Sequence, residues 1–342
     1  METQAKNMAH TSLSIYAWNV NTGGGAVLLD RLARTARERY SEVRVFADPR
    51  NPSPYLRKIG ARYVSGRLEA LTMGEAGARN IYFGNVPPLR RVPNSLLYVH
   101  SPYVVKTVGE LLTSKLETRL KVRHMLLALL LKLFHRNVDR VCCQTASMQD
   151  ALAHNHGISA ELMPFYPPIE AVAPRQKVFD LCYVGLPSAH KNHEFLLDVM
   201  EVLGQEDRPT VRVAVTIPKT LANRQLLDRI TVLNNHAPIE IVNHGLVPHP
   251  AALDIYRESR ALLFPSRLET YGLPLIEATL LGLPVFCPSL PYSNDVLEDF
   301  VPVDLTDTAA TATLIGHFLA NPGDYPPPKL RMPDMIDRLL QT

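Results

Sequence analysis

The feature that most constrains the fold is a short apolar segment followed by a turn and a helix start. Residues 261–264 (Ala-Leu-Leu-Phe) have the length of a buried strand, and the chain then reaches Gly272, Leu273 and Pro274. Gly272 lets the backbone approach a ligand closely, and Pro274 suits the first turn of a helix. A helix that starts here directs free N–H groups and a positive dipole end beyond the strand, which favours binding of a phosphate.

The same order of strand, glycine and helix opens both halves of the chain. Residues 12–17 predict a strand, and a loop with three glycines leads into a helix predicted for residues 26–39. Residues 179–185 predict a strand ending at a glycine, followed by a helix over 193–203 with Asn192 as its N-cap. This order is typical of a doubly wound α/β domain.

Two such domains fit a chain of 342 residues. The proline-rich segment 164–169 breaks the periodic pattern and marks the boundary between them. We therefore predict an N-terminal domain over residues 1–170 and a second domain over 171–325. Residues 326–342 form a tail, and a short helix at 336–340 is expected to pack back on the first domain.

Two carboxylates flank the turn at Gly272. Glu269 lies in the loop before the turn, and Glu277 lies in the first turns of the predicted helix. Because Gly272 and Pro274 separate them, they are expected to line one cavity at two depths. Taken alone, a glutamate pair at this spacing is also consistent with two solvated side chains.

In their order along the chain, these residues resemble the signature of retaining GT-B glycosyltransferases of family 4. The resemblance rests on Pro-Ser at 265–266, Tyr-Gly-Leu-Pro at 271–274, Glu-Ala at 277–278 and Gly-Leu-Pro-Val at 282–285. It covers nearly all of the second domain and, more loosely, the first. It implies two doubly wound, Rossmann-like domains that face each other across a cleft.

The resemblance also implies roles for the residues of the turn. Gly272, Leu273 and Pro274 would bind a nucleotide-sugar donor. Glu269 would hold hydroxyls of the donor sugar beside the reacting carbon, and Glu277 would hold the ribose of the nucleotide.

Lys191 stands at the start of the helix predicted for 193–203, a suitable position for a pyrophosphate. In the family that it resembles, this lysine neutralises the leaving diphosphate. The family pattern often has an arginine directly after the glycine of the preceding strand, whereas this chain has Leu186 there. Arg267 or Lys219 could replace the missing cation.

In the first domain, the resemblance singles out the glycine loop and His100. The loop resembles the N-terminal glycine loop of the family, with Gly24 or Gly25 as the contact; a merely flexible turn is the alternative. Neither this loop nor the one after residue 185 fits the Gly-x-Gly-x-x-Gly fingerprint, which argues against an NAD-linked dehydrogenase. His100 follows a strand predicted for 96–99, and ligands of open α/β sheets bind at such strand ends. In many family members a histidine at this place reaches the donor sugar.

In the second domain, the turn formed by Gly245, Leu246 and Val247 resembles the base-binding turn of the family. Its main-chain groups would meet the nucleobase. Such contacts hardly depend on side chains, so the sequence does not identify the base.

Composition excludes several other classes of protein. The formal net charge of +3 is too small to indicate a nucleic-acid partner, and the longest apolar run, 125–131, is too short to span a bilayer. The first ten residues are polar and predict no signal peptide. The four cysteines show no Cys-x-x-Cys spacing, as expected for reduced thiols of a cytoplasmic protein. No Asp-x-Asp triplet or His/Cys set predicts a metal site, and no cofactor is expected beyond the nucleotide sugar itself.

Residues 106–140 form a basic segment, and its part over 115–136 predicts a basic helix with an apolar middle. Such a helix can lie on an anionic membrane surface at the inner face of the cytoplasmic membrane. It can equally pack on the sheet with its charges in water. Membrane contact would suit a lipid-linked acceptor.

The family resemblance therefore implies a metal-independent, retaining glycosyltransferase of the hexosyltransferase type. It would move a sugar from a nucleotide diphosphate sugar to a hydroxyl of a glycan or lipid-linked acceptor, in the synthesis of a surface polysaccharide or lipopolysaccharide. Two alternatives are a nucleotide-sugar epimerase of GT-B fold and a subunit that binds a nucleotide sugar without catalysis.

Overall fold

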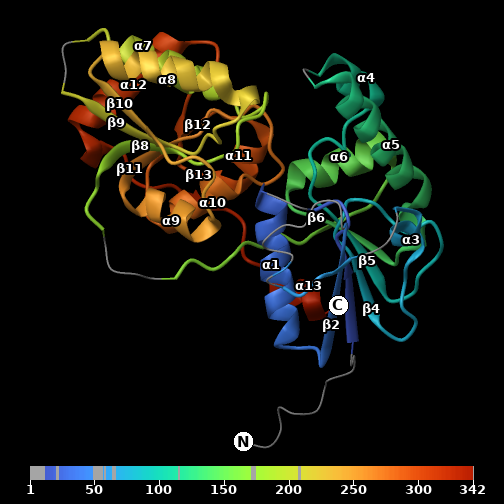
Figure 1. Cartoon of the computed structure of the whole chain (residues 1–342). Helices are drawn as coiled ribbons and strands as arrows, with labels where there is room; N and C mark the ends of the chain where they lie inside the picture. Colours follow the sequence, from blue (N-terminus) through green and yellow to red (C-terminus); the bar gives the residue numbers. More distant parts are fainter. Residues whose placement is uncertain are drawn as a thin grey trace, which may run out of the picture. The chain divides into compact units, whose positions relative to one another are not determined.

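A computed structural model describes residues 12–20, 23–48, 57, 59–63, 67–114, 116–170, 175–206 and 209–341. The chain divides into two compact units (Figure 1). Unit 1 comprises Met1–Pro167 and Pro333–Thr342, and unit 2 comprises Pro168–Met332. The sequence placed the first division at residue 170 and the start of the tail at 326.

A seven-stranded sheet forms the centre of unit 1. Its strand order is β3-β2-β1-β4-β5-β6-β7, and every neighbouring pair is parallel. The order reverses between β1 and β4, so the loops after these strands border the position where open α/β sheets bind ligands. The strands are β1 (Ser12–Tyr16), β2 (Glu42–Ala47), β3 (Arg62–Tyr63), β4 (Arg79–Tyr82), β5 (Ser95–Val99), β6 (Arg140–Cys143) and β7 (Glu161–Leu162).

The helices of unit 1 follow the strands along the chain. They are α1 (Gly23–Arg37), α3 (Arg67–Thr72), α4 (Val108–Thr113), α5 (Thr118–Phe134), the 3₁₀ helix η1 (His135–Asn137), α6 (Ala146–His156) and α13 (Ile336–Gln341). Local chemistry sets the ends of α6. The Thr145 side chain accepts a hydrogen bond from Met148 N, and Gly157 ends the helix with φ 66°.

The basic segment 106–140 contains two helices, and the second, α5, lies within the range 115–136 predicted for the basic helix. Helix α4 begins with a capping box in which Thr107 and Glu110 exchange hydrogen bonds, and it ends at Thr113, before Ser114, whose backbone is extended. Helix α5 starts only at Thr118 and ends at Phe134. Lys115, between the two helices, lies outside the described residues.

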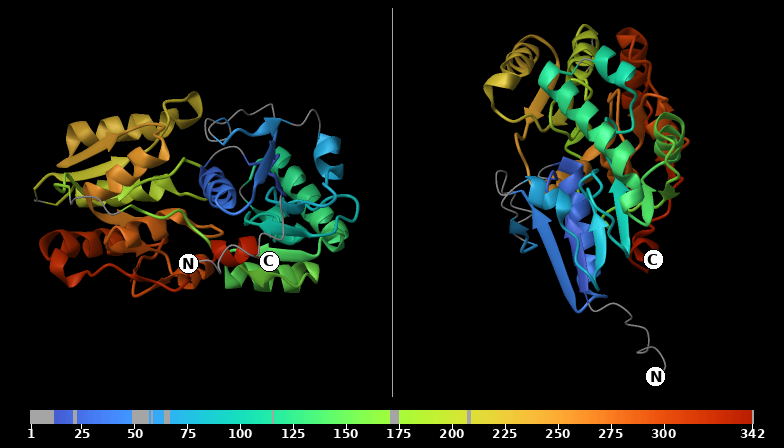
Figure 2. Two further views of the ribbon diagram at one scale, coloured as in Figure 1. Left: turned by 90° about the horizontal axis from the view of Figure 1, so that it is seen from below. Right: turned by 90° about the vertical axis from the view of Figure 1, so that its right-hand side faces the viewer.

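The C-terminal helix α13 belongs to unit 1 (red in Figure 2), although all of unit 2 precedes it in sequence. The buried guanidinium of Arg79 donates to the carbonyl oxygens of Leu339 (2.6 Å) and Leu340 (2.7 Å). The Tyr40 hydroxyl also donates to Leu340 O. These donors satisfy carbonyl groups that the end of a helix leaves without partners.

Unit 2 contains a six-stranded parallel sheet in the order β10-β9-β8-β11-β12-β14. Its order reverses between β8 and β11. The strands are β8 (Phe179–Tyr183), β9 (Val211–Val215), β10 (Ile239–Asn243), β11 (Ser259–Leu263), β12 (Val285–Cys287) and β14 (Val301–Pro302). A separate antiparallel pair joins β13 (Leu297–Glu298) to β15 (Lys329–Leu330), which keeps residues 326–332 with unit 2.

Helices cover both faces of this sheet, with α7, α8 and α12 on one side and α9 and α10 on the other (Figure 1). The helical elements are α7 (His193–Leu203), η2 (Leu221–Asn223), α8 (Arg224–His236), α9 (His249–Arg257), α10 (Leu273–Leu280), α11 (Pro291–Val296), α12 (Thr308–Ala320) and η3 (Pro322–Asp324). Strand residues such as Leu181, Val213 and Leu262 are fully buried. A parallel sheet covered on both faces explains why these strands read as continuous apolar runs.

Candidate active site

The turn after β11 forms as the sequence predicts. Gly272 has φ 66° and ψ 60°, a conformation that L-residues rarely adopt, and an added Cβ would lie 3.1 Å from the Leu275 side chain. Helix α10 begins at the next residue, with Pro274 in its first turn. The first N–H groups of α10 therefore point away from the helix at the carboxyl end of β11.

Glu269, in the loop before this turn, forms an ion pair with Lys191. Its Oε1 atom lies 2.6 Å from Lys191 Nζ, and both side chains are mostly buried, at 12% and 16% exposure. The Ser266 hydroxyl donates to the same oxygen at 2.6 Å. The ammonium group also lies 5.2 Å from the centre of the Phe264 ring, a cation–π contact. The sequence predicted both charged residues as site residues but not that they pair.

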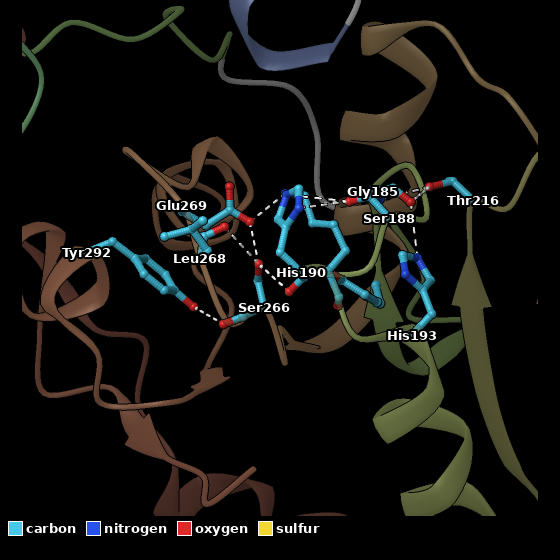
Figure 3. A network of polar contacts seen from close by, with 11 residues as sticks. Gly185, Ser188, His190, His193, Thr216, Ser266, Leu268, Glu269 and Tyr292 are labelled. Carbon is cyan, nitrogen blue, oxygen red and sulfur yellow. Dashed lines mark hydrogen bonds and ion pairs between the residues drawn. The ribbon is translucent and has the colours of Figure 1, made fainter. Parts of the chain in front are cut away.

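A main-chain hydrogen bond and a side-chain hydroxyl join the loop that follows β11 to the loop that follows β8. Arg267 N donates to His190 O at 2.7 Å, and the Ser266 hydroxyl lies within 3.3 Å of the same carbonyl. Figure 3 shows Ser266 between Glu269, His190 and Tyr292, whose hydroxyl donates to Ser266 O at 2.7 Å. Because β8 and β11 are neighbours at the reversal of strand order, these loops meet at the expected ligand position of unit 2.

The start of α7 differs from the prediction at Asn192. The helix begins at His193 as predicted, but Asn192 has φ 56° and its side chain does not cap the helix. Capping requires an extended backbone at this residue, and the left-handed conformation directs the side chain elsewhere. The Asn192 Nδ2 atom is buried and has no hydrogen bond among the described residues.

The next residue, His193, is held by the strand end. Its Nε2 lies 3.2 Å from Gly185 O, so Nε2 carries the proton and donates it. Burial lowers the pKa of His193 to about 4, with smaller contributions from Lys191 and His190. His193 is therefore neutral at pH 7.

Glu277 is buried in α10, where its Oε1 accepts a hydrogen bond from His249 Nε2 at 2.7 Å. Burial, with the Glu277 charge as a smaller cause, raises the pKa of Tyr256 well above its usual value, so that hydroxyl keeps its proton. Both glutamates of the predicted pair thus lie in unit 2, and each carboxylate is held by a side chain from another element. The roles expected for them stay predictions.

Gly245 has a left-handed backbone conformation, with φ 69°, which glycine adopts more easily than other residues. Its N–H donates to Asn243 Oδ1 at 3.0 Å, and the same oxygen accepts from Ile217 N. This N–H is therefore engaged within the protein. The contacts predicted for a nucleobase fall on the remaining main-chain groups of Gly245, Leu246 and Val247.

Unit 1 brings together two further predicted residues. Gly23, Gly24 and Gly25 lie in the first turn of α1 and not in a loop before the helix, which corrects the prediction that the helix begins at residue 26. A Cβ at Gly25 would lie 3.2 Å from the His100 ring. Because glycine has no side chain, the helix start can approach the histidine closely.

The ring of His100 is fixed by its neighbours at the ends of β4 and β5. Its Nε2 lies 2.8 Å from Phe83 O, and the ring stacks on Phe83 with centroids 4.6 Å apart. Asn85 accepts a hydrogen bond from His100 N. Burial lowers the pKa of His100 to about 4, so the imidazole is neutral at pH 7 and donates from Nε2.

This pKa predicts how acid affects stability. Below its unfolded pKa of about 6.5, His100 binds a proton in the unfolded chain but not in the folded protein. Its contribution to stability is therefore complete above pH 6.5 and is lost as the pH falls towards 4. His124 and His193 are lowered to about the same value. Together, these three histidines should lower the unfolding temperature as the pH falls from 7 to 5. We expect His100→Asn to reduce this fall by about one third. Thermal unfolding at several pH values measures this, and parallel slopes for variant and wild type would contradict it.

The cation that could replace the missing arginine remains a prediction. Leu186 is exposed after Gly185. Arg267 is exposed in the loop that binds His190, and in the described part of the chain its guanidinium makes no ion pair or side-chain hydrogen bond. Lys219 is exposed after β9.

We also searched the described residues for metal sites and for membrane-spanning helices. Among the residues that the structure describes, no group of three or more His, Cys, Asp or Glu side chains is arranged to hold a metal ion. Within the same residues, no helix has the length and apolar content needed to cross a bilayer.

The fold and site define an α/β protein with two doubly wound units and a candidate ligand site at a reversal of strand order. Residues 179–321, within unit 2, match the family model described as "Glycosyl transferases group 1". A search of curated protein sequences found no match.

Several solved structures have a similar fold, and one of them is described as a glycosyltransferase. Anabaena Alr3699/HepE in complex with UDP-glucose has a TM-score of 0.66 and 13% identity, over 92% of each chain. WaaG, a glycosyltransferase involved in lipopolysaccharide biosynthesis, has a TM-score of 0.59 and 12% identity, over 96% of this chain and 98% of that one. S. aureus TarM, in a complex that contains UDP, has a TM-score of 0.57 and 14% identity over 74% of this chain, which spans only 50% of that protein. The predicted GT-B fold is thus confirmed.

Sequence reasoning missed three residues of this site. Ser266 and Tyr292 fix the loop of Glu269, and His249 holds Glu277. Ser266 stands within the recognised motif, so its position was available from the sequence. No sequence signal marks His249, because its partner lies 28 residues away.

Proposed function

We propose that this protein is a retaining glycosyltransferase of family 4 that transfers a sugar from a nucleotide diphosphate sugar to a hydroxyl group. The ion pair between Lys191 and Glu269 carries the proposal, because it joins a cation and a carboxylate at the reversal of strand order in unit 2, where open α/β sheets bind ligands. The family match over residues 179–321 supports it. UDP-glucose and UDP in the structures of similar fold favour a nucleotide-sugar donor.

In the proposed reaction, Lys191 and the N-terminus of α10 stabilise the negative charge that grows on the diphosphate as the glycosidic bond loosens. A lysine ammonium has three N–H donors, so the bond to Glu269 leaves two for phosphate oxygens. Glu269 orients the sugar through its hydroxyls. The departing phosphate oxygen takes the acceptor's proton on the same face, which gives retention, and the transfer uses no metal. The roles that the family resemblance implies for His100, Gly24 and Gly25 stay predictions.

The first test is a screen of UDP, GDP and other nucleotides and nucleotide sugars for thermal stabilisation, because a bound ligand raises the unfolding temperature by mass action. The nucleotide sugar that stabilises most is then incubated with and without candidate acceptors. Sugar transfer with retained anomeric configuration is expected. An altered sugar in the absence of acceptor would instead identify an epimerase, and nucleotide binding with no turnover would identify a non-catalytic subunit. A protein that binds none of these nucleotides would refute the proposal.

The finer proposal for the acceptor is that it is lipid-linked and that α5 rests on an anionic membrane at its cytoplasmic face. Residues Leu127, Ala128 and Leu131 of α5 are buried in unit 1. The opposite side carries an exposed apolar stripe of Val122, Leu126, Leu129 and Leu133, each between 51% and 60% exposed. Their spacing of four, three and four residues aligns them on one face of the helix.

No acidic residue occurs between 118 and 136, and basic residues flank the apolar stripe. The basic residues are Arg119, Lys121, Arg123, Lys132 and Arg136. A second copy of the chain docked on this stripe would bring equal charges together, whereas anionic lipid headgroups would complement them. The stripe therefore fits a lipid surface better than a homodimer.

We expect at least about tenfold tighter binding to vesicles that contain phosphatidylglycerol than to pure phosphatidylcholine vesicles, measured by flotation. The double substitution Leu126→Glu and Leu129→Glu should abolish this binding while leaving the fold intact, since both side chains are exposed. Leu221→Glu, at a leucine of unit 2 that is 89% exposed, is the matched control. Sedimentation as a dimer that the double substitution dissociates would show that the stripe serves self-association instead.

A further inference from the structure

Glu277 is held in place by a residue that the family resemblance did not bring into the site. The two side chains are mostly buried, at 8% exposure for Glu277 and 19% for His249, and Nε2 lies 2.7 Å from Oε1. A buried carboxylate requires such a partner. The bond joins the first residue of α9 to α10, two helices that pack together in unit 2.

The bond uses one side of the carboxylate. His249 Nε2 donates to Oε1, and the buried Tyr256 hydroxyl also interacts with this carboxylate. A carboxylate has about four lone-pair positions, so it can still accept hydrogen bonds from a ligand. A glutamate loses considerable rotamer freedom when its carboxylate is fixed, and a protein that fixes it beforehand reduces this cost at binding. Pro248 and Pro250 stand on either side of His249 and restrict the backbone that carries the imidazole.

His249 also lies close in sequence to the predicted base-binding turn. Only Pro248 separates it from Val247, so the start of α9 connects that turn to Glu277. One short segment thus carries both the main-chain groups expected at the base and the side chain that orients the carboxylate expected at the sugar of the nucleoside.

We infer that His249 is a positioning residue that makes the site select ribonucleotides over deoxyribonucleotides. It holds Glu277 in the orientation in which Oε2 accepts hydrogen bonds from the vicinal 2′- and 3′-hydroxyls of ribose. The inference rests on the proposed function, which assigns the ribose to Glu277. A site with a buried acceptor for a hydroxyl rejects the analogue that lacks it, because the acceptor is then left unpaired.

The test compares the affinity for UDP with the affinity for 2′,3′-dideoxy-UDP by titration calorimetry; GDP and its dideoxy analogue are used if the wild type binds the guanine nucleotide. The wild type should prefer the ribonucleotide by at least about tenfold. His249→Ala should weaken ribonucleotide binding about tenfold and leave dideoxynucleotide binding within about twofold. Glu277→Ala should do the same, and the double variant should lose no more than either single one, because both substitutions remove one interaction.

Two further variants separate positioning from a general structural role. His249→Gln places an amide donor near the position of Nε2 and should restore most of the ribose preference. His236→Ala removes an exposed imidazole at the end of α8 and should change nothing. In turnover assays, His249→Ala should raise KM for the donor and leave kcat within about twofold.

Equal loss of affinity for both nucleotides in His249→Ala, or full retention of the ribose preference, would overturn the inference. A wild type that binds neither nucleotide refutes the proposed function instead. Failure of the inference can therefore be distinguished from failure of the proposed function.

Discussion

Replacement of Glu269 by alanine is expected to reduce sugar transfer by about a hundredfold to a thousandfold or more. The carboxylate would lose its contact with the donor sugar, and Lys191 would lose the partner that holds its ammonium group in place. Removal of a single preorganised electrostatic contact typically costs this much in kcat. Initial rates of nucleotide release and product formation at saturating donor measure the effect.

The same variant should remain folded. An unpaired, mostly buried ammonium group costs about 1–3 kcal/mol, which for a unit of this size lowers the unfolding temperature by about 2–10 °C. Assays at 25 °C should therefore see the native protein. Glu240→Ala is the matched control, because Glu240 pairs with Arg212 near the start of β10, at the opposite end of the sheet from the site, and both side chains are partly exposed. Near-normal turnover by Glu269→Ala would contradict the assigned role.

Replacement of Lys191 by alanine is expected to have an effect of similar size for a different reason. The ammonium group would stabilise charge on the diphosphate, which is larger in the transition state than in the bound donor. The fall in kcat should therefore exceed the loss of donor affinity. Affinity for UDP should decrease, whereas affinity for uridine, which has no phosphate, should stay within about twofold of the wild type.

Two control variants test whether the effect of Lys191→Ala depends on the positive charge and on the position of the lysine. Lys191→Arg keeps the charge but changes its shape, and should recover only part of the activity. Lys329→Ala removes a well-exposed lysine elsewhere in unit 2 and should leave turnover unchanged. If Lys191→Ala and Glu269→Ala both turn over at near-normal rates, the proposed site is refuted. If Lys191→Ala loses uridine affinity as strongly as UDP affinity, the lysine does not act on the phosphates.

Much of the fold followed from local sequence signals. The helix start after Gly272 was predictable because only glycine adopts its positive φ easily and Pro274 fits a first turn. The bounds of α7 were predictable from the apolar face of that helix. The buried parallel strands were predictable because each is a short apolar run in the sequence.

Other features could not be read from local signals. Asn192 looks like an N-cap by residue type, but its backbone is left-handed and its side chain does not cap the helix. The glycines before residue 26 look like a loop, yet they form the first turn of α1 beside His100. The apolar middle of α5 did not reveal which leucines are buried and which are exposed, since apolar residues stand on both faces of the helix.

The sequence by itself determined the α/β class, the turn at Gly272 and the identity of the charged residues, because each depends on a few neighbouring residues. Only the tertiary structure decided that Lys191 meets Glu269 and that His249 meets Glu277. These partners are 78 and 28 residues apart, and they are joined only when β8 pairs with β11 and α9 packs on α10. Strand order and helix packing are set by burial of the whole core, so no local pattern encodes them.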